Sequence, residues 1–241
     1  MVEARNVQIG VLSPATPHSP HFKSLGDILP PGVAMIHEGL GLLGESYQDL
    51  AGKTDRIIEL AGSFVRRHDV SGLMVTGGFV TLFNPGLEKK LGDTIGLPVV
   101  GAISSAVAAL TVFRAKTVLL MTPFDAASDQ ILKAHLNNLG FTVQLGPAFE
   151  DRKAGSPVNL SREELFRLVG GALGANPPVQ AIYFQGATMD PLPILQRLED
   201  RHHVPVVTSN SAMIWHLLSR LGLTCSIQKY GQLLEGWPPL P

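Results

Sequence analysis

Two short turns carry residues whose types and spacing suit the binding of a small acid. The first is Thr76-Gly77-Gly78-Phe79, which follows the apolar run 72–75, and the second is Gln185-Gly186, which follows the apolar run 181–184. A buried strand that ends in small residues and leads into a helix leaves backbone N–H groups free, and such groups attract anions. We therefore expect a carboxylate ligand at Thr76, Gly77, Gly78, Phe79, Gln185 and Gly186.

Both turns belong to one longer pattern, which predicts a duplicated chain. Each unit reads as a strand, a small-residue turn, a helix, a short Pro-Val-Val strand, a serine-rich turn and a helix. In the first unit this last helix is expected over 106–113. Gly78 lies 20 positions before Pro98, and Gly186 lies 19 positions before Pro205. Ligands of open parallel sheets bind beyond the carboxyl ends of the strands, so four such turns, with Ser209 in the last, can converge on one acid. Taken singly, each glycine is better explained by a tight strand-to-helix turn, and the four matched turns together favour a site.

The loop after the first predicted strand is a further candidate. The apolar run 7–12 predicts a buried parallel strand, and the loop 13–21 that follows is polar and rich in proline. We expect this loop to form the rim of a crevice, with Ser13 and Pro14 at its start and His18 and His21 as titratable groups. A solvated surface loop is the alternative.

Aromatic and hydroxyl residues lie at two other predicted element ends. Apolar residues recur at helical spacing over 46–68, and Tyr47 stands at the start of that predicted helix. Its phenol could hydrogen-bond a carboxylate or simply pack. A further buried strand is predicted over 116–122, and Thr122 and Phe124 at its end complete the candidate binding residues.

Capping signals mark two more helices. Asp125 precedes a predicted helix over 126–139, which Gly140 would end. Ser161 with Glu164 three positions later predicts a capping box. The alternation of buried strands and helices along the chain predicts an α/β fold.

Composition narrows the classes of partner. The chain has 241 residues, of which 45% are hydrophobic, and 19 basic side chains stand against 20 acidic ones. A balanced charge without a basic run argues against nucleic acid or an anionic membrane as the partner, and it favours a small molecule. Neither a signal peptide nor an apolar stretch of about 20 residues is evident, so a cytoplasmic location is expected. The oligomeric state stays open.

Motifs for metals and cofactors are absent from the sequence. The single cysteine, Cys225, excludes an internal disulfide and a cysteine-rich zinc site, and its place beyond both turns predicts a packing role. There is no G-x-x-x-x-G-K-[ST] phosphate loop and no G-x-S-x-G elbow. We expect neither a metal nor a cofactor.

The order of these motifs resembles the aspartate/glutamate/hydantoin racemase superfamily, in particular its arylmalonate decarboxylase and maleate isomerase branch. The resemblance implies an α/β fold of two similar doubly wound, Rossmann-like parallel-sheet halves related by a pseudo-twofold duplication. It places residues 1–113 with 214–241 in the first half, residues 114–213 in the second, and the active site between them. The matching segments are Ile9-Gly10-Val11 with Pro14, Glu38-Gly39-Leu40-Gly41-Leu42, Tyr47, Leu97-Pro98-Val99, Ser105-Ala106-Val107, Thr188-Met189-Asp190-Pro191-Leu192-Pro193 and Val204-Pro205-Val206-Val207.

Enzymes of this superfamily need no cofactor and use cysteines at the duplicated turns to move a proton next to a carboxylate. Neither turn of this chain has a thiol. The first turn has Gly77-Gly78, as arylmalonate decarboxylases have glycine there. A count without gaps places Tyr183 at the family's second cysteine, and a count with a gap places Gln185 or Gly186 there.

Three functions follow from the resemblance and this departure. The first is a cofactor-independent lyase similar to arylmalonate decarboxylase, in which a less polar pocket around Phe79, Val80 and Phe124 expels one carboxylate and water or Tyr183 protonates an enediolate. The second is an isomerase or racemase-like enzyme that uses Tyr183, His18 or His21. The third is a carboxylate-binding homologue that has lost catalysis.

Overall fold

The computed structural model describes residues 6–15, 23–150 and 153–241. These residues form two four-stranded parallel sheets with strand orders β2-β1-β3-β4 and β6-β5-β7-β8. The second order repeats the first, which confirms the predicted α/β fold of two similar halves. The strands are β1 Val7–Ser13, β2 Val33–Gly39, β3 Gly72–Val75, β4 Val99–Gly101, β5 Thr117–Met121, β6 Thr142–Leu145, β7 Ala181–Phe184 and β8 Val206–Thr208.

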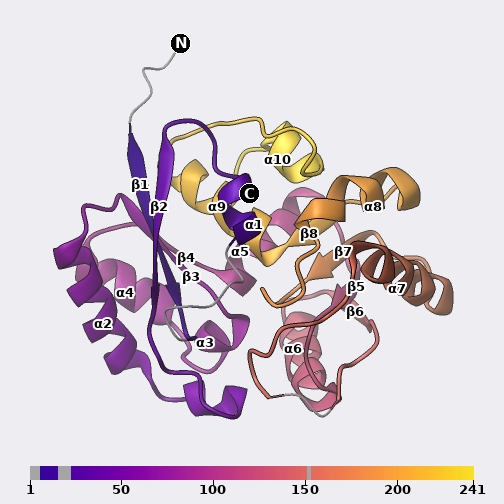
Figure 1. Cartoon of the computed structure of the whole chain (residues 1–241), viewed down its shortest axis with the longest axis horizontal. Coiled ribbons are helices and arrows are strands. Elements are labelled where there is room, and N and C mark those ends of the chain that lie inside the picture. Colours follow the sequence, from indigo (N-terminus) through magenta and orange to yellow (C-terminus); the bar gives the residue numbers. More distant parts are fainter. Residues whose placement is uncertain (1–5, 16–22, 151–152) are drawn as a thin grey trace.

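Helices cover the sheets and fill the space between them. In Figure 1, α2 and α4 lie beside the first sheet, α6, α7 and α8 lie beside the second, and α5 and α9 lie between the two. The helices are α1 Lys23–Asp27, α2 Thr54–Arg67, α3 Gly78–Leu82, α4 Leu87–Ile95, α5 Ala102–Val112, α6 Ala126–Asn138, α7 Arg162–Ala175, α8 Leu195–His202, α9 Ser209–Arg220 and α10 Gln232–Gly236, with the short 3₁₀ segments η2 Tyr47–Leu50 and η3 Leu192–Ile194.

The central strands β1, β3, β5 and β7 are apolar because they are buried on both faces. All four residues of β3 and all four of β7 are buried. In β1, Gly10 leaves room for a neighbouring helix, since a Cβ atom there would lie 2.6 Å from the ring of Phe64 in α2. The pairing of β1 with β3, from Ile9 opposite Gly72 to Leu12 opposite Val75, sets the register of the strand ends where the cavity described below lies.

Helices α5 and α9 join the two halves. They follow β4 and β8, so they are equivalent elements, and they pack against each other. The tail beyond α9 contacts α8 as well, because the N–H of Gln232 donates to Glu199 at 2.8 Å and that of Gly231 donates to Gln196 at 3.1 Å. The division of the chain at residues 113 and 213 stays a prediction.

Two helix predictions are wrong in their extent. The predicted helix 46–68 is divided into η2 and α2, because Gly52 between them takes the left-handed conformation with φ of +66°. The helix expected from Ala106 begins at Ala102 instead, where the Ser104 hydroxyl accepts the N–H of Gly101 and starts the helix directly after β4. Tyr47 therefore lies in a short 3₁₀ segment rather than at the start of a long helix.

The predicted caps are confirmed. The Asp125 carboxylate accepts the N–H of Ser128 at 2.7 Å, and Ser161 with Glu164 forms a capping box. Gly140 follows α6 with a φ of +90°. No helix among the described residues is long and apolar enough to cross a membrane.

Candidate active site

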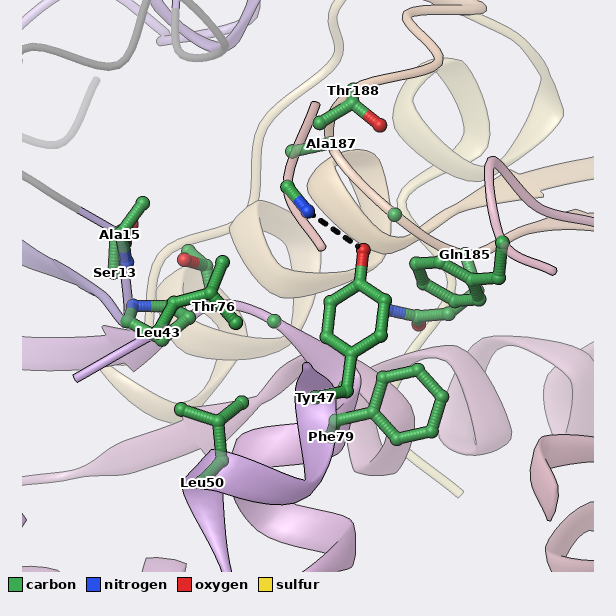
Figure 2. A pocket seen from close by; sticks show the side chains of 16 residues that line it. Ser13, Ala15, Leu43, Tyr47, Leu50, Thr76, Phe79, Gln185, Ala187 and Thr188 are labelled. Carbon is green, nitrogen blue, oxygen red and sulfur yellow. Dashed lines mark hydrogen bonds between the residues drawn. The ribbon is translucent and has the colours of Figure 1, made fainter. Parts of the chain in front are cut away.

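A cavity of about 80 Å³ lies between the two halves, beyond the carboxyl ends of β1, β3 and β7. Figure 2 shows its walls, to which Tyr47 and Phe79 contribute from the first half and Gln185 and Thr188 from the second. Ten of the residues predicted to bind ligand line it, so two of the four predicted turns, those at Gly77 and Gly186, converge, whereas the two serine-rich turns do not line it. The cavity is lined by Ser13, Pro14, Ala15, Leu43, Tyr47, Leu50, Thr76, Gly77, Gly78, Phe79, Phe124, Gly155, Gln185, Gly186, Ala187 and Thr188.

The first turn is fixed against β1. The N–H and the hydroxyl of Thr76 both donate to the carbonyl of Leu12, at 2.9 and 3.2 Å. Gly77 has a φ of +80°, and a Cβ atom there would lie 2.9 Å from Pro14, so the turn requires glycine. The helix that follows, α3, has only five residues, and its dipole is correspondingly short. Any anion binding here thus depends on the N–H groups of the turn itself.

The second turn repeats this geometry at the end of β7. The N–H of Gln185 donates to the carbonyl of Met121 at 3.0 Å, as Thr76 does to Leu12. Gly186 has a φ of +115°, and a Cβ atom there would lie 2.6 Å from Pro123. Gly186 is therefore equivalent to Gly77. The sequence spacing paired it with Gly78, and that pairing is wrong by one residue because the helical segments after the two turns differ in length.

Tyr183 does not line the cavity, which corrects its predicted contact with the substrate. Its side chain is fully buried in β7, and its hydroxyl donates to the Oε1 atom of Gln185. Burial raises the pKa of the phenol far above its ordinary value, so it stays protonated. Of this pair, Gln185 faces the ligand space and Tyr183 lies behind it.

Aromatic rings close one side of the cavity. The ring centroid of Tyr47 lies 4.7 Å from that of Phe79 and 5.0 Å from that of Phe124, and the two phenylalanines are 5.1 Å apart. The Tyr47 hydroxyl accepts the N–H of Gly155 at 3.1 Å, the bond drawn as a dashed line in Figure 2. This aromatic cluster, defined by Tyr47, Phe79 and Phe124, joins segments of both halves over the cavity.

Other candidates lie elsewhere. The Thr122 hydroxyl donates to Asp129 and accepts the N–H of Phe124 at 3.1 Å, so it holds the chain behind the cavity wall. Ser209 is buried as the first residue of α9 and does not line the cavity, and Val80 is buried in α3 without lining it. His18 and His21 lie outside the described residues.

Cys225 does not line the cavity either. The thiol is half-buried in the tail, and burial raises its pKa, which keeps it in the less reactive protonated form. This setting agrees with a packing role.

Six lining residues were not among the predicted ones. Leu43 and Gly155 come from loops that the tertiary structure brings together, and no local pattern marks them. Thr188 stood in a family-like segment, and its Oγ1 atom is buried without a hydrogen-bond partner among the described residues. The remaining three are Ala15, Leu50 and Ala187.

The cavity wall carries no formal charge. Among the described lining residues there is no Asp, Glu, Lys, Arg, His or Cys, and Tyr47 is the one titratable side chain. The described residues also contain no group of three His, Cys, Asp or Glu side chains placed to hold a metal ion. The polar groups available to a ligand are amide N–H groups and hydroxyls.

Comparison with known proteins identifies the family. A double mutant of arylmalonate decarboxylase in liganded form matches with a TM-score of 0.84 and 20% identity, over 95% of this chain and 99% of that chain. The maleate isomerase from Pseudomonas putida S16 matches with a TM-score of 0.80 and 16% identity, over 96% and 99%. The maleate cis-trans isomerase from Nocardia farcinica matches with a TM-score of 0.81 and 17% identity, over 95% and 98%.

At these identities the structural matches show a shared fold. No curated protein matches the chain in sequence. The family model for arylmalonate decarboxylase, however, matches residues 10–234, which is nearly the whole chain. The protein therefore belongs to the arylmalonate decarboxylase family.

Proposed function

We propose that the protein is a cofactor-independent lyase that decarboxylates a small malonate-type dicarboxylic acid. The observation that carries the proposal is the lack of a carboxylate, imidazole, amine or thiol among the described residues of the cavity wall. Racemisation and isomerisation both begin with a group that removes a proton from carbon or adds to it. Decarboxylation begins without such a group, because the first bond to break releases carbon dioxide.

A thiol is the nucleophile in one relative with this fold. The maleate isomerase of Nocardia farcinica has been solved with a covalently bound succinylcysteine intermediate. In this chain the single cysteine, Cys225, does not line the cavity. This difference argues against an isomerase that works through cysteine, and it requires a lyase in this chain to take its proton from water.

In the proposed reaction the bond between the α-carbon and one carboxyl carbon breaks, and carbon dioxide leaves without the electron pair. That pair forms an enediolate with the remaining carboxylate, and a proton from water then bonds to the α-carbon. N–H groups of the two turns and of Gln185 would stabilise the enediolate oxygens. Phe79 and Phe124 would surround the departing carboxylate with apolar surface, which favours the loss of its charge.

The size of the cavity favours a small substituent on the substrate. The volume is about 80 Å³, whereas benzene fits an apolar protein cavity of roughly 150 Å³. The aromatic cluster forms one side of this space. We therefore favour malonate or methylmalonate over an arylmalonate.

The test is incubation of the purified protein in D₂O with malonate, methylmalonate, phenylmalonate, maleate and glutamate, followed by NMR. We expect acetate or propionate with a deuteron at the α-carbon, at a rate unchanged after dialysis against EDTA. Heat-denatured protein measures the spontaneous reaction. Formation of fumarate from maleate, or exchange at the α-carbon of glutamate, would instead identify an isomerase or racemase.

A carboxylate-binding protein without turnover is the second candidate. The lack of a charged or strongly acidic group in the described cavity wall favours it, since the Tyr47 phenol is the most acidic side chain that lines it. The same experiment separates the two functions. Binding of propionate or malonate without release of carbon dioxide would support the binding protein.

A further inference from the structure

Gln185 is the polar side chain that reaches from the second half to the first. It is 1% exposed, it lines the cavity, and its Oε1 atom accepts the hydroxyl of Tyr183. Its Nε2 atom lies against the first turn, because a Cβ atom added to Gly78 would be 2.8 Å from Nε2 and 3.0 Å from Cδ. Glycine at position 78 thus makes room for the amide.

Tyr183 determines which end of this amide faces the cavity. The two residues are separated by two positions at the end of β7, so their side chains project to the same side. A buried phenol needs an acceptor for its proton, and the Gln185 oxygen supplies it. A reversed amide would leave the phenol proton without that acceptor and would turn the oxygen toward the ligand.

The Nε2 hydrogens remain available. No acceptor among the described residues is bonded to them. Nε2 is also absent from the fully buried polar atoms without a partner, so it is accessible from the cavity that Gln185 lines. Carboxylates and enediolates accept hydrogen bonds and donate none, so an amide held with its nitrogen forward favours them. An amide held with its oxygen forward would repel them.

We propose that Gln185 is the side chain that binds the carboxylate or enediolate oxygen, and that Tyr183 is a positioning residue that fixes the Gln185 amide rather than a proton donor. This inference rests on the proposed carboxylate site. It assigns the second turn a fixed hydrogen-bond donor, and it leaves the protonation of carbon to water.

The test is a double-mutant cycle of Tyr183→Phe and Gln185→Leu. Both variants keep the shape of the buried group approximately and remove its hydrogen bonds. The measurements are kcat and KM for methylmalonate, Kd for propionate by NMR titration, and the urea midpoint of each variant. Tyr230→Phe, at a half-buried position in the tail, is the matched control for loss of a phenol.

We expect Gln185→Leu to lower kcat by ~10²-fold, which is typical of the loss of one donor to an oxyanion. Tyr183→Phe should lower kcat by about tenfold, through loss of amide orientation, and it should cause no further loss in the Gln185→Leu background. Gln185→Glu should weaken propionate binding at neutral pH at least as much as Gln185→Leu. Tyr230→Phe should match the wild type.

The outcomes distinguish this inference from the proposed function. If the losses of kcat in Tyr183→Phe and Gln185→Leu add in the double variant, Tyr183 acts independently of Gln185, as a proton donor or in a purely structural role. That result would overturn the inference and leave the proposed lyase activity intact. If the wild type binds propionate but releases no carbon dioxide, the proposed lyase function is wrong. The double-mutant cycle then tests the inference through the Kd for propionate alone. If propionate does not bind, or binds Gln185→Leu as well as the wild type, the inference is overturned.

Discussion

The two duplicated turns share a backbone and differ in what their side chains do. Thr76 and Gln185 occupy equivalent positions, since the N–H of each donates to the last residues of the neighbouring strand, Leu12 or Met121. Thr76 also directs its hydroxyl back to that strand. Gln185 instead extends across the cleft to Gly78 and is held by Tyr183. Duplication fixed the scaffold, and a longer side chain at one position made the site asymmetric.

The same contrast appears three residues later. Phe79 of the first turn corresponds to Thr188 of the second, and both line the cavity. Phe79 stacks with Tyr47, whereas the Thr188 hydroxyl is buried without a partner among the described residues. At this pair of equivalent positions, one half thus contributes an apolar ring and the other a hydroxyl. A decarboxylase needs both, because one carboxylate must be held while the other is desolvated.

The largest effect is expected where the halves are alike. Gly77→Ala and Gly186→Ala should each lower the free energy of unfolding by about 3 kcal/mol, because each adds a Cβ atom to a residue with positive φ against a proline. Urea denaturation measures both. Gly171→Ala, in α7 with open space around it, is the control and should stabilise by about 0.5–1 kcal/mol. A loss in one turn only would contradict their equivalence.

The next effect concerns the segments Ser13-Pro14-Ala15 and Thr122-Pro123-Phe124, whose prolines lie against Gly77 and Gly186. The Ser13 and Thr122 hydroxyls each accept the N–H two residues on, but Thr122 also donates to buried Asp129. Desolvation by burial raises the pKa of Asp129 to about 6. The folded state therefore holds this proton more tightly than the unfolded state, whose carboxyl titrates near 4. Its contribution to stability is complete below about pH 4 and is lost as the pH rises through about 6.

Asp129→Asn removes this titration and keeps an acceptor for Thr122. Relative to the wild type it should gain about 2 kcal/mol of unfolding free energy at pH 8 and about none at pH 4. Urea titrations at both pH values test the difference, with Asp93→Asn at an exposed site as the control. An equal effect at both pH values would show that Asp129 does not titrate in this range.

A smaller effect is expected where the two turns differ. Phe79→Leu should enlarge the cavity on the apolar side and raise the ratio of kcat/KM for phenylmalonate to that for methylmalonate by roughly tenfold. The thermal midpoint checks that the variant remains folded. Leu139→Ala, at an exposed position, should leave the ratio unchanged. An unchanged ratio in Phe79→Leu would mean that another residue limits the substituent.

The smallest effect concerns the bond that joins the halves over the cavity. Tyr47→Phe removes the acceptor of the Gly155 N–H, and it should lower the free energy of unfolding by about 1 kcal/mol. Hydrogen exchange should accelerate at Gly155 and leave Gly140 unaffected. Unchanged exchange at Gly155 would show that this bond does not hold the two segments together in solution.

The sequence determined the architecture because its signals are local. Buried runs of apolar residues specify parallel strands, and Asp125, Ser161 and the glycine turns specify where helices begin. The repeated pattern was enough to predict two similar halves and the strand ends where a ligand would bind. Ten of the predicted binding residues therefore line one cavity.

Tertiary structure alone decided which of these residues face the ligand. Tyr183 lies within β7 and is buried beneath the cavity, whereas Gln185, on the same side but just beyond the strand end, lines it. Contacts across the halves placed Gly155 on Tyr47 and the Gln185 amide on Gly78, at separations of about a hundred residues in the chain. Such pairs leave no periodic or local trace in sequence, because each depends on how the surfaces of the two halves meet.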